Sequence, residues 1–250
     1  MTGVNLVMPM AGRGSRFVQA GVRTPKPLID VRGRPMYAWA TDSLPLSLAS
    51  RLIFLCLREH LSGTDLERDI HARYGRLSPV IVPIDEVTEG QACTVLLARE
   101  WIDDDRHLVI FNADTWYRSS LEQALPTLPS SVAGMLGVFR AEGDRWSFAR
   151  TDTEGRVVET AEKRRISDLA CTGLYHFTRG SDFVRYSGEM IRDNDRVNGE
   201  FYVAPVYNRM IRDGLDVRVD VADEAWALGT PEDLEQFTRK YPRPVVRGRE

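Results

Sequence analysis

The chain has 250 residues, 43% of them hydrophobic, and a formal net charge of −3 at pH 7. This length allows one large α/β domain with a substantial core, and the interspersed charges exclude a general polyanion-binding surface, so we expect no nucleic-acid partner. No apolar run approaches the length of a membrane span, so we expect no membrane partner either.

The cysteines indicate the redox environment. Cys56, Cys93 and Cys171 are isolated and lack Cys-x-x-Cys spacing. Such cysteines indicate neither a disulfide framework nor a zinc site. The apolar run at residues 4–8 is short and ends at Pro9, which is unlike a signal segment. These features predict a cytoplasmic protein.

The strongest functional pattern lies in the first thirty residues. A buried strand predicted over 4–8 leads directly into a loop that contains Gly12 and Gly14. Glycines let backbone N–H groups turn toward a bound anion. Arg16 and Lys26 add two positive charges near this loop, which could hold a triphosphate and stabilise a phosphorus under attack. The pattern predicts a nucleotide-phosphate site.

Two common phosphate loops do not fit this stretch. A Rossmann dinucleotide loop needs a third glycine where this chain has Phe17, and the Gly-Lys-Ser/Thr sequence of a P-loop is absent. An ordinary turn is the remaining alternative, and Arg16 and Lys26 argue against it.

Two short stretches show a family resemblance: Met8-Pro9-Met10-Ala11-Gly12-Arg13-Gly14-Ser15-Arg16-Phe17 and Pro25-Lys26-Pro27-Leu28. Together they resemble the signature of the sugar-1-phosphate nucleotidyltransferases, also called nucleoside-diphosphate-sugar pyrophosphorylases. The resemblance implies that Arg16 and Lys26 are catalytic. It also implies a nucleotide-binding loop made of Ala11, Gly12, Gly14 and Ser15.

Strand and helix patterns alternate in the first half of the chain. Helices are predicted over 36–44 and 61–74, and continuous apolar runs of strand length occupy 52–57 and 80–84. This alternation is typical of a parallel sheet covered on both faces. We therefore predict an α/β fold with three layers and a Rossmann-like, mostly parallel central sheet.

A helix predicted over 91–101 follows a glycine-containing loop. By the family resemblance, Gly90 and Gln91 in this loop read the nucleotide base, and an amide side chain can both donate to and accept from a base edge. The alternative is that Gln91 only occupies the first turn of the helix.

Asp114 follows the strand predicted over 108–111. Open α/β sheets bind ligands beyond the carboxyl ends of their strands, and Mg²⁺ prefers oxygen ligands shared with phosphate. The resemblance makes Asp114 a ligand of Mg²⁺ or another divalent cation, whereas the alternative is an Asx turn. The run 103–105 is also acidic, but it precedes the strand and is predicted to be a solvated turn.

The second half changes from parallel to antiparallel patterns. A strand is predicted over 133–139, and a turn at 152–156 joins 147–151 to 157–160 as a hairpin. This change predicts an antiparallel insertion that binds the acceptor.

The family resemblance extends to the acceptor side. It implies that Glu162 binds sugar hydroxyls and that Lys163 binds the sugar phosphate, although a surface ion pair is the alternative for these two residues. It also implies that Gly173, in the strand 171–177, lets the acceptor approach the backbone and that Glu200 faces the acceptor.

Residues 226–234 resemble the closing Gly-Thr-Pro-Glu-Asp motif of the family, with Thr230 as the cap of a helix. Many relatives have a second metal-binding aspartate here, where this chain has Ala227 and Leu228. Asp220 and Asp223 are candidates to replace it.

A single nucleotidyltransferase domain is predicted over 1–240. Its nucleotide-binding half covers about 1–140 and its acceptor-binding half about 141–240, and 241–250, rich in proline and arginine, is predicted to be a flexible tail. Homo-oligomerisation is left open.

The predicted function is transfer of NMP from an NTP, with a pyrimidine nucleotide favoured, to a sugar 1-phosphate or similar phosphorylated small molecule. Pyrophosphate is released, and the product is an activated donor for glycan, capsule or secondary-metabolite synthesis. One alternative is a glycosyltransferase of related fold, which usually has two aspartates flanking one residue, unlike Asn112-Ala113-Asp114. The other is a non-catalytic nucleotide sensor, an alternative that the Ala227-Leu228 departure keeps open.

Overall fold

The computed structural model describes residues 3–241, and the rest of the predicted tail, 242–250, lies outside the described residues. Tyr241 was assigned to the tail, yet its ring packs 4.5 Å from that of Phe237 and 5.6 Å from that of Trp39, measured between centroids. The folded structure therefore includes Tyr241. Within 3–241, no helix is long and apolar enough to cross a bilayer.

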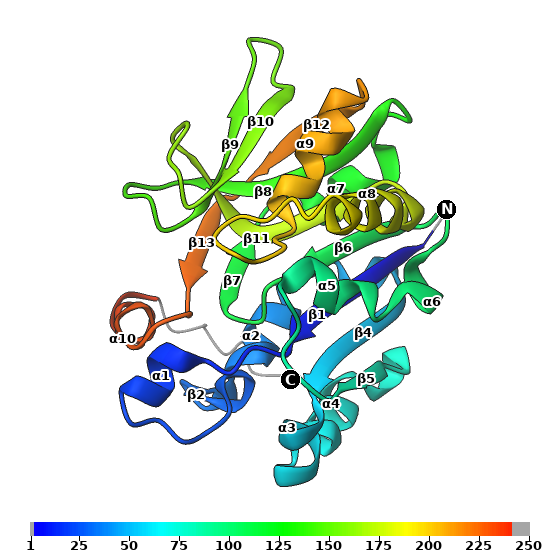
Figure 1. Cartoon of the computed structure of the whole chain (residues 1–250). Coiled ribbons are helices and arrows are strands. Elements are labelled where there is room, and N and C mark those ends of the chain that lie inside the picture. The colour runs from blue at the N-terminus through cyan, green and yellow to red at the C-terminus, as the bar shows by residue number, and fades with distance from the viewer. Residues whose placement is uncertain (1–2, 242–250) are drawn as a thin grey trace, which may run out of the picture.

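Four parallel strands form the amino-terminal part of a nine-stranded sheet (Figure 1). They are β1 (Val4–Met10), β4 (Ala49–Leu57), β5 (Val80–Ile84) and β6 (His107–Phe111). Their order is β6-β1-β4-β5, and each pair of neighbours is parallel. This parallel region was predicted from the apolar runs and is confirmed.

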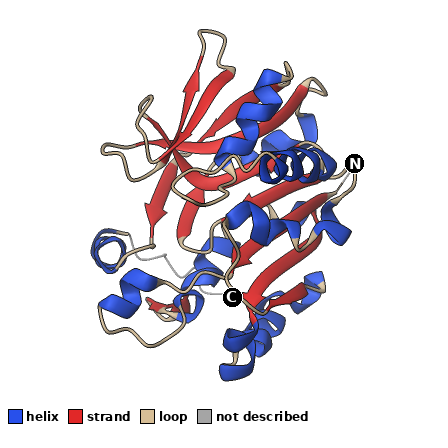
Figure 2. Cartoon of the chain, viewed as in Figure 1, coloured by secondary structure: helices blue, strands red, loops and turns tan. Residues whose placement is uncertain are grey.

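Helices cover both faces of this sheet (Figure 2). The helices of the described residues are α1 (Ser15–Gln19), α2 (Met36–Thr41), α3 (Arg58–Gly63), α4 (Leu66–Tyr74), α5 (Gln91–Leu96), α6 (Arg99–Ile102), α7 (Leu121–Ala124), α8 (Gly180–Arg192), α9 (Ala204–Arg212) and α10 (Pro231–Lys240). Of these, α1 and α10 pack with part of α2 in a third cluster. Along β1, Leu6 and Met8 join a core cluster with α2 and α4, whereas Val7 joins the cluster that contains α5, α8 and α9. Because successive strand side chains point to opposite faces, both faces of β1 are apolar and buried. The predicted three layers are confirmed.

The second half of the chain adds antiparallel strands to the same sheet. They are β8 (Val132–Arg140), β9 (Ser147–Thr151), β10 (Val157–Glu162) and β11 (Leu169–Phe177), while β12 (Asp216–Val221) pairs in parallel with β8. β11 runs antiparallel to β6, β8 and β9, and β9 and β10 form the predicted hairpin. Two short pairs lie outside this sheet: β2 (Asp30–Val31) with β3 (Arg34–Pro35), and β7 (Thr115–Arg118) with β13 (Glu224–Ala227).

The helix predicted over 61–74 is interrupted. α3 ends at Gly63, and the Thr64 hydroxyl then accepts a hydrogen bond from the Leu66 N–H at 3.2 Å, where α4 begins. A threonine hydroxyl that binds a nearby backbone N–H competes with a continuous helix.

The helix predicted over 91–101 is also two helices. The N–H groups of Leu97 and Ala98 bind carbonyl groups three residues back, at 3.1 and 3.0 Å. This tighter turn ends α5, and α6 begins at Arg99.

The acidic run 103–105 is not simply solvated. The Asp104 carboxylate accepts hydrogen bonds from Asn5 at 3.2 Å, from Arg51 at 3.0 Å and from the Arg106 N–H at 3.0 Å. Burial opposes ionisation of Asp104, but the hydrogen bonds from Arg106 and Arg51 outweigh it and lower the pKa of Asp104. This aspartate therefore joins the start of β6 to β1 and β4.

Candidate active site

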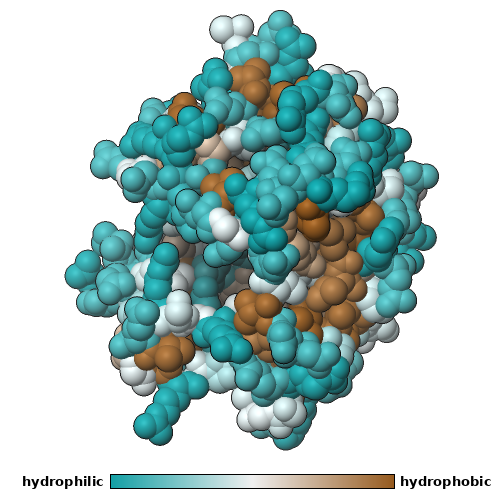
Figure 3. All heavy atoms as spheres, viewed as in Figure 1, coloured by the Kyte–Doolittle hydropathy of each residue, from teal (hydrophilic) through white to brown (hydrophobic). Residues whose placement is uncertain are grey.

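A cleft of about 620 Å³ lies where the parallel strands end. Its walls come from the segments after β1, β5 and β6, from the ends of β9 and β10, and from the loop before α9, and Figure 3 shows a hollow in this mostly hydrophilic face. The fold thus gathers distant segments at the edge where open α/β sheets bind ligands. Eight predicted site residues line the cleft: Ala11, Gly12, Lys26, Gly90, Gln91, Asp114, Glu162 and Glu200.

A smaller cavity of about 160 Å³ shares several wall residues with the cleft and so extends it. Arg16 and Gly173 line this extension. Three predicted site residues line neither space, namely Gly14, Ser15 and Lys163. Gly14 and Ser15 begin α1, next to the lining residue Gly12, so they lie beside the loop rather than in its wall.

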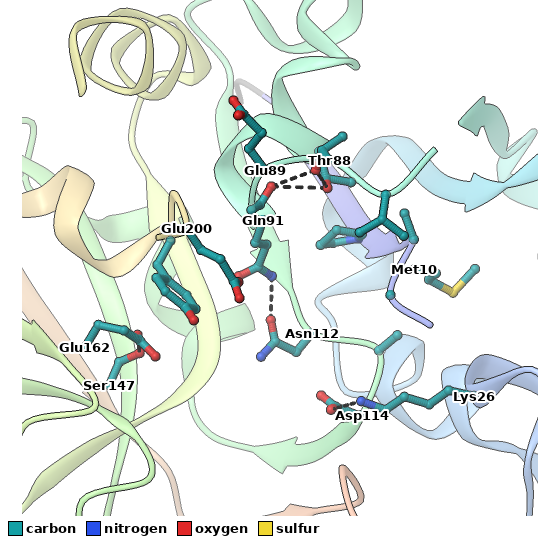
Figure 4. Close-up of a pocket in the computed structure, with 18 of the residues that line it drawn as sticks. Met10, Lys26, Thr88, Glu89, Gln91, Asn112, Asp114, Ser147, Glu162 and Glu200 are labelled. Carbon is teal, nitrogen blue, oxygen red and sulfur yellow. Dashed lines mark hydrogen bonds and ion pairs between the residues drawn. The ribbon is translucent and has the colours of Figure 1, made fainter. Parts of the chain in front are cut away.

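Lys26 and Asp114 form an ion pair inside the cleft (Figure 4). Lys26 begins a short 3₁₀ turn, Lys26–Leu28, and Asp114 lies just beyond β6. Each side chain is about one quarter exposed (23% and 24%), which leaves both within reach of a ligand. The predicted catalytic cation and the predicted metal ligand therefore lie together. A metal ion at Asp114 has to share this carboxylate with Lys26 or displace Lys26 from it.

β13 and the residues after it pass directly beside Asp114. The Leu228 N–H donates to the Asp114 carbonyl at 2.7 Å, and Ala227 and Gly229 line the extension of the cleft. The Leu228 side chain is fully buried among Phe17 and other core residues. Positions 227–229 thus approach the predicted metal ligand without supplying a second carboxylate.

The proposed replacements, Asp220 and Asp223, line neither the cleft nor its extension. Asp220 is buried on β12 and accepts a hydrogen bond from the Ser119 hydroxyl at 2.7 Å. Burial, together with the charge of Asp223, raises the pKa of Asp220 to about 7. Asp220 is therefore packed inside the fold, away from the cleft.

This setting predicts a pH-dependent stability. Because the folded state keeps a proton on Asp220 that the unfolded state has lost, stability falls as pH rises from about 4 to about 7. Above about pH 7, ionisation of Asp220 lowers the free energy of unfolding by at most about 4 kcal/mol. Asp220→Asn removes this cost because asparagine does not ionise. In urea unfolding, the variant should therefore be more stable than the wild type at about pH 8 and nearly as stable as the wild type at about pH 4. An equal effect at both pH values, or the same effect in the exposed control Asp144→Asn, would contradict this account.

The nucleotide side of the cleft depends on a close backbone contact at Gly90. Gly90 has φ +143°, and a Cβ atom there would lie 2.4 Å from the Phe201 carbonyl oxygen. The backbone of Phe201 also bonds to the Glu89 carbonyl at 2.9 Å and to the Ala92 N–H at 3.0 Å. Only glycine fits this position, and the contact holds the loop before α5 against the loop before α9.

Gln91 is both the first residue of α5 and part of the cleft wall. Its amide nitrogen donates to the Asn112 side-chain oxygen at 2.6 Å (Figure 4). A Cβ atom on Gly173, whose φ is +87°, would lie 2.3 Å from the Asn112 side-chain nitrogen. Asn112 therefore touches the nucleotide side through Gln91 and the acceptor side through Gly173. No site role was predicted for Asn112, although it lies two residues before Asp114.

Asn112→Ala should loosen the orientation of Gln91. Losing one side-chain hydrogen bond costs about 1 kcal/mol, so we expect the KM for the nucleotide to rise about five- to tenfold, with a smaller change in kcat. Steady-state kinetics of Asn112→Ala, Gln91→Ala and the double variant form the test. If Asn112 acts through Gln91, the two effects are not additive. Full additivity would contradict the role proposed for this contact.

The acceptor side is formed by the hairpin and β11. Glu162 ends β10 opposite Ser147 at the start of β9, and the Ser147 hydroxyl donates to the Glu162 carboxylate. Burial raises the pKa of Glu162, and the nearby charge of Glu200 adds to the effect. Tyr175 and Tyr202 also line the cleft, and none of Ser147, Tyr175 and Tyr202 was predicted as a site residue.

Lys163 does not pair with Glu162 as a surface ion pair. It has φ +50°, and its ammonium donates to the Tyr202 hydroxyl at 2.7 Å. This hydrogen bond raises the pKa of Lys163. Lys163 thus reaches the edge of the cleft only through Tyr202.

Comparisons with known proteins agree with this geometry. The family model described as nucleotidyl transferase matches residues 6–243. A nucleoside-diphosphate-sugar pyrophosphorylase from Vibrio cholerae RC9 shares 30% identity with this chain; the alignment covers 94% of this chain and 100% of that one, with a TM-score of 0.80.

Two curated relatives are more distant. A CMP-5'-(3-aminopropyl)phosphonate synthase from Streptomyces rubellomurinus is 25% identical over 96% of this chain, which corresponds to 39% of the length of that protein. A UTP–glucose-1-phosphate uridylyltransferase from Haloferax volcanii is 21% identical over 98% of this chain and 99% of its own length. The chain therefore belongs to the nucleotidyl transferase family, as its amino-terminal motifs and its fold indicate.

Proposed function

We propose that this protein transfers NMP from a nucleoside triphosphate to the phosphate or phosphonate group of a small molecule and releases pyrophosphate. One observation supports this most strongly: a single cleft joins Lys26 and Asp114 to Gln91 on one side and to Glu162 on the other. The family assignment agrees with it. The names of the relatives, which contain CMP and UTP, favour a pyrimidine nucleotide and either a sugar phosphate or a phosphonate as acceptor.

Nucleotidyltransferases of this family usually depend on a metal. Within residues 3–241, no cluster of three or more His, Cys, Asp or Glu side chains could hold a metal ion. Mg²⁺ needs only one or two carboxylates when phosphate oxygens fill its other positions, so Asp114 alone fits an ion that arrives with the nucleotide. When bound, such an ion would neutralise charge on the triphosphate.

Different residues of the cleft then bind the triphosphate, contact the base and stabilise the reacting phosphate. The loop residues Ala11 and Gly12, together with Arg16, hold the triphosphate, and Gln91 contacts the base. An acceptor oxygen attacks the α-phosphorus in line; the new P–O bond forms as the α–β bridge bond breaks and pyrophosphate leaves. Lys26 stabilises the charge that develops on the α-phosphate. No covalent enzyme intermediate is needed.

Pyrophosphate release tests this proposal. The common nucleoside triphosphates are each combined with magnesium and a panel that contains glucose 1-phosphate, inositol 1-phosphate and 3-aminopropylphosphonate. We expect release only when one nucleotide and one acceptor are both present. Release without an acceptor would contradict the proposal. No release from folded protein with any pair would instead favour the nucleotide sensor.

A further inference from the structure

Charge is distributed unevenly along the cleft. Figure 4 shows Lys26 on one side of the pocket and Glu162 and Glu200 on the other. Arg16, in the extension, adds positive charge near Asp114. The cleft therefore has a cationic region suited to phosphates and a separate anionic region beyond it.

Neither carboxylate of the anionic region forms an ion pair with another residue of the range 3–241, although Lys163 lies close enough for its charge to act on both. Among residues 3–241, no lysine, arginine or histidine nitrogen lies within 4.0 Å of the carboxylate of Glu162 or of Glu200, and Glu162 is bonded only to the Ser147 hydroxyl. Burial is the main cause that raises the pKa of Glu162; the charge of Lys163 opposes this rise, and the charge of Glu200 adds to it. Like charges that face one space repel, and a cation that binds both of them relieves this repulsion.

The nearest cationic side chains are engaged elsewhere. Lys163 donates to the Tyr202 hydroxyl at 2.7 Å, with its ammonium 4.9 Å from the centre of that ring. Arg196 bonds to Glu89 at 3.1 Å and to the Gly199 carbonyl at 3.0 Å, and its guanidinium lies 4.1 Å from the Phe201 ring. These contacts hold the loop that carries Glu200. Lys163 offsets part of the negative charge of Glu162 and Glu200 from the edge of the cleft but forms an ion pair with neither.

We propose that the acceptor carries a protonated amino group in addition to its phosphate or phosphonate, and that Glu162 and Glu200 bind this ammonium group. The proposal rests on the proposed function and names the chemical class of its acceptor. An ammonium group donates up to three hydrogen bonds and neutralises the carboxylate pair, whereas a hydroxyl donates one hydrogen bond and leaves the repulsion in place.

Matched acceptors that differ only in this group test the proposal. Each pair contains an amine and the corresponding alcohol: 2-aminoethyl and 2-hydroxyethyl phosphate, 3-aminopropyl- and 3-hydroxypropylphosphonate, and glucosamine 1-phosphate and glucose 1-phosphate. We expect kcat/KM for pyrophosphate release to be at least about tenfold higher for the amine in the best pair, since a charged partner strengthens such hydrogen bonds substantially.

The outcomes separate this proposal from the proposed function. Turnover of alcohols as fast as amines would keep the nucleotidyltransferase reaction and overturn the ammonium site. No turnover of any acceptor with any nucleotide would contradict both.

Glu200→Gln tests the carboxylate itself. Glu200 is exposed and keeps its shape as glutamine, so the variant should fold, which a thermal melt checks. We expect the amine-to-alcohol ratio of kcat/KM to fall about tenfold, mainly through a higher KM for the amine. Glu142→Gln, an exposed change of the same kind outside the cleft, should leave the ratio unchanged. An unchanged ratio in Glu200→Gln would overturn the proposal.

Discussion

Lys26→Ala is expected to lower kcat at least about a hundredfold, because one preorganised charge contact to a developing anion contributes roughly 3 kcal/mol to transition-state stabilisation. Lys26 is only 23% exposed, and its ammonium is fixed against Asp114 in the cleft. Such a fixed cation needs little reorganisation when charge develops on the α-phosphate. Steady-state pyrophosphate release with the preferred nucleotide and acceptor measures the effect.

Lys240→Ala provides the matched control. Lys240 ends α10 and is exposed, so removing its charge should change kcat by less than about twofold. A melting temperature for Lys26→Ala close to that of the wild type would show that the lost activity is not unfolding. Wild-type activity in Lys26→Ala would exclude this lysine from the chemistry.

Asp114→Asn is expected to remove metal-dependent turnover, again with a loss of at least about a hundredfold. Asparagine has nearly the same shape, and the Leu228 N–H bonds to the backbone carbonyl of residue 114, so the local fold should persist. The amide is a much weaker Mg²⁺ ligand than a carboxylate and no longer attracts Lys26. Magnesium titrations of activity should show half-maximal activity at a much higher concentration than in the wild type.

Asp105→Asn is the control for this change, because Asp105 is exposed and lies outside the cleft. It should leave the magnesium titration unchanged. Wild-type magnesium dependence in Asp114→Asn would place the metal on other groups and contradict the role of Asp114.

Strands β1, β4 and β6 could be predicted from the sequence because each contains a short apolar run buried on both faces, as in Leu52–Leu57 of β4. The helix breaks were not predicted. They depend on local hydrogen bonds, such as that from the Leu66 N–H to the Thr64 hydroxyl, which hydrophobic spacing does not record. α8 and the pair of β7 and β13 were also absent from the predictions.

Residues of the cleft wall were predictable where they belong to contiguous motifs, as at Gly12, Lys26 and Asp114. Ser147 was not, because it meets Glu162 only through the register of β9 and β10. The position of Asn112 likewise depends on its hydrogen bond with Gln91 and on the space that Gly173 leaves by lacking a Cβ atom. Pairings of this kind come from tertiary structure, so a single sequence does not reveal them.

Isotope tracing tests the central claim that an oxygen of the acceptor phosphate or phosphonate attacks the α-phosphorus. The acceptor identified by pyrophosphate release would be prepared with oxygen-18 in its phosphate or phosphonate group, and both products analysed by mass spectrometry. Direct attack on the α-phosphorus predicts that all label appears in the nucleotide-linked product and that pyrophosphate stays unlabelled. Label in pyrophosphate, or loss of label to water, would contradict this mechanism.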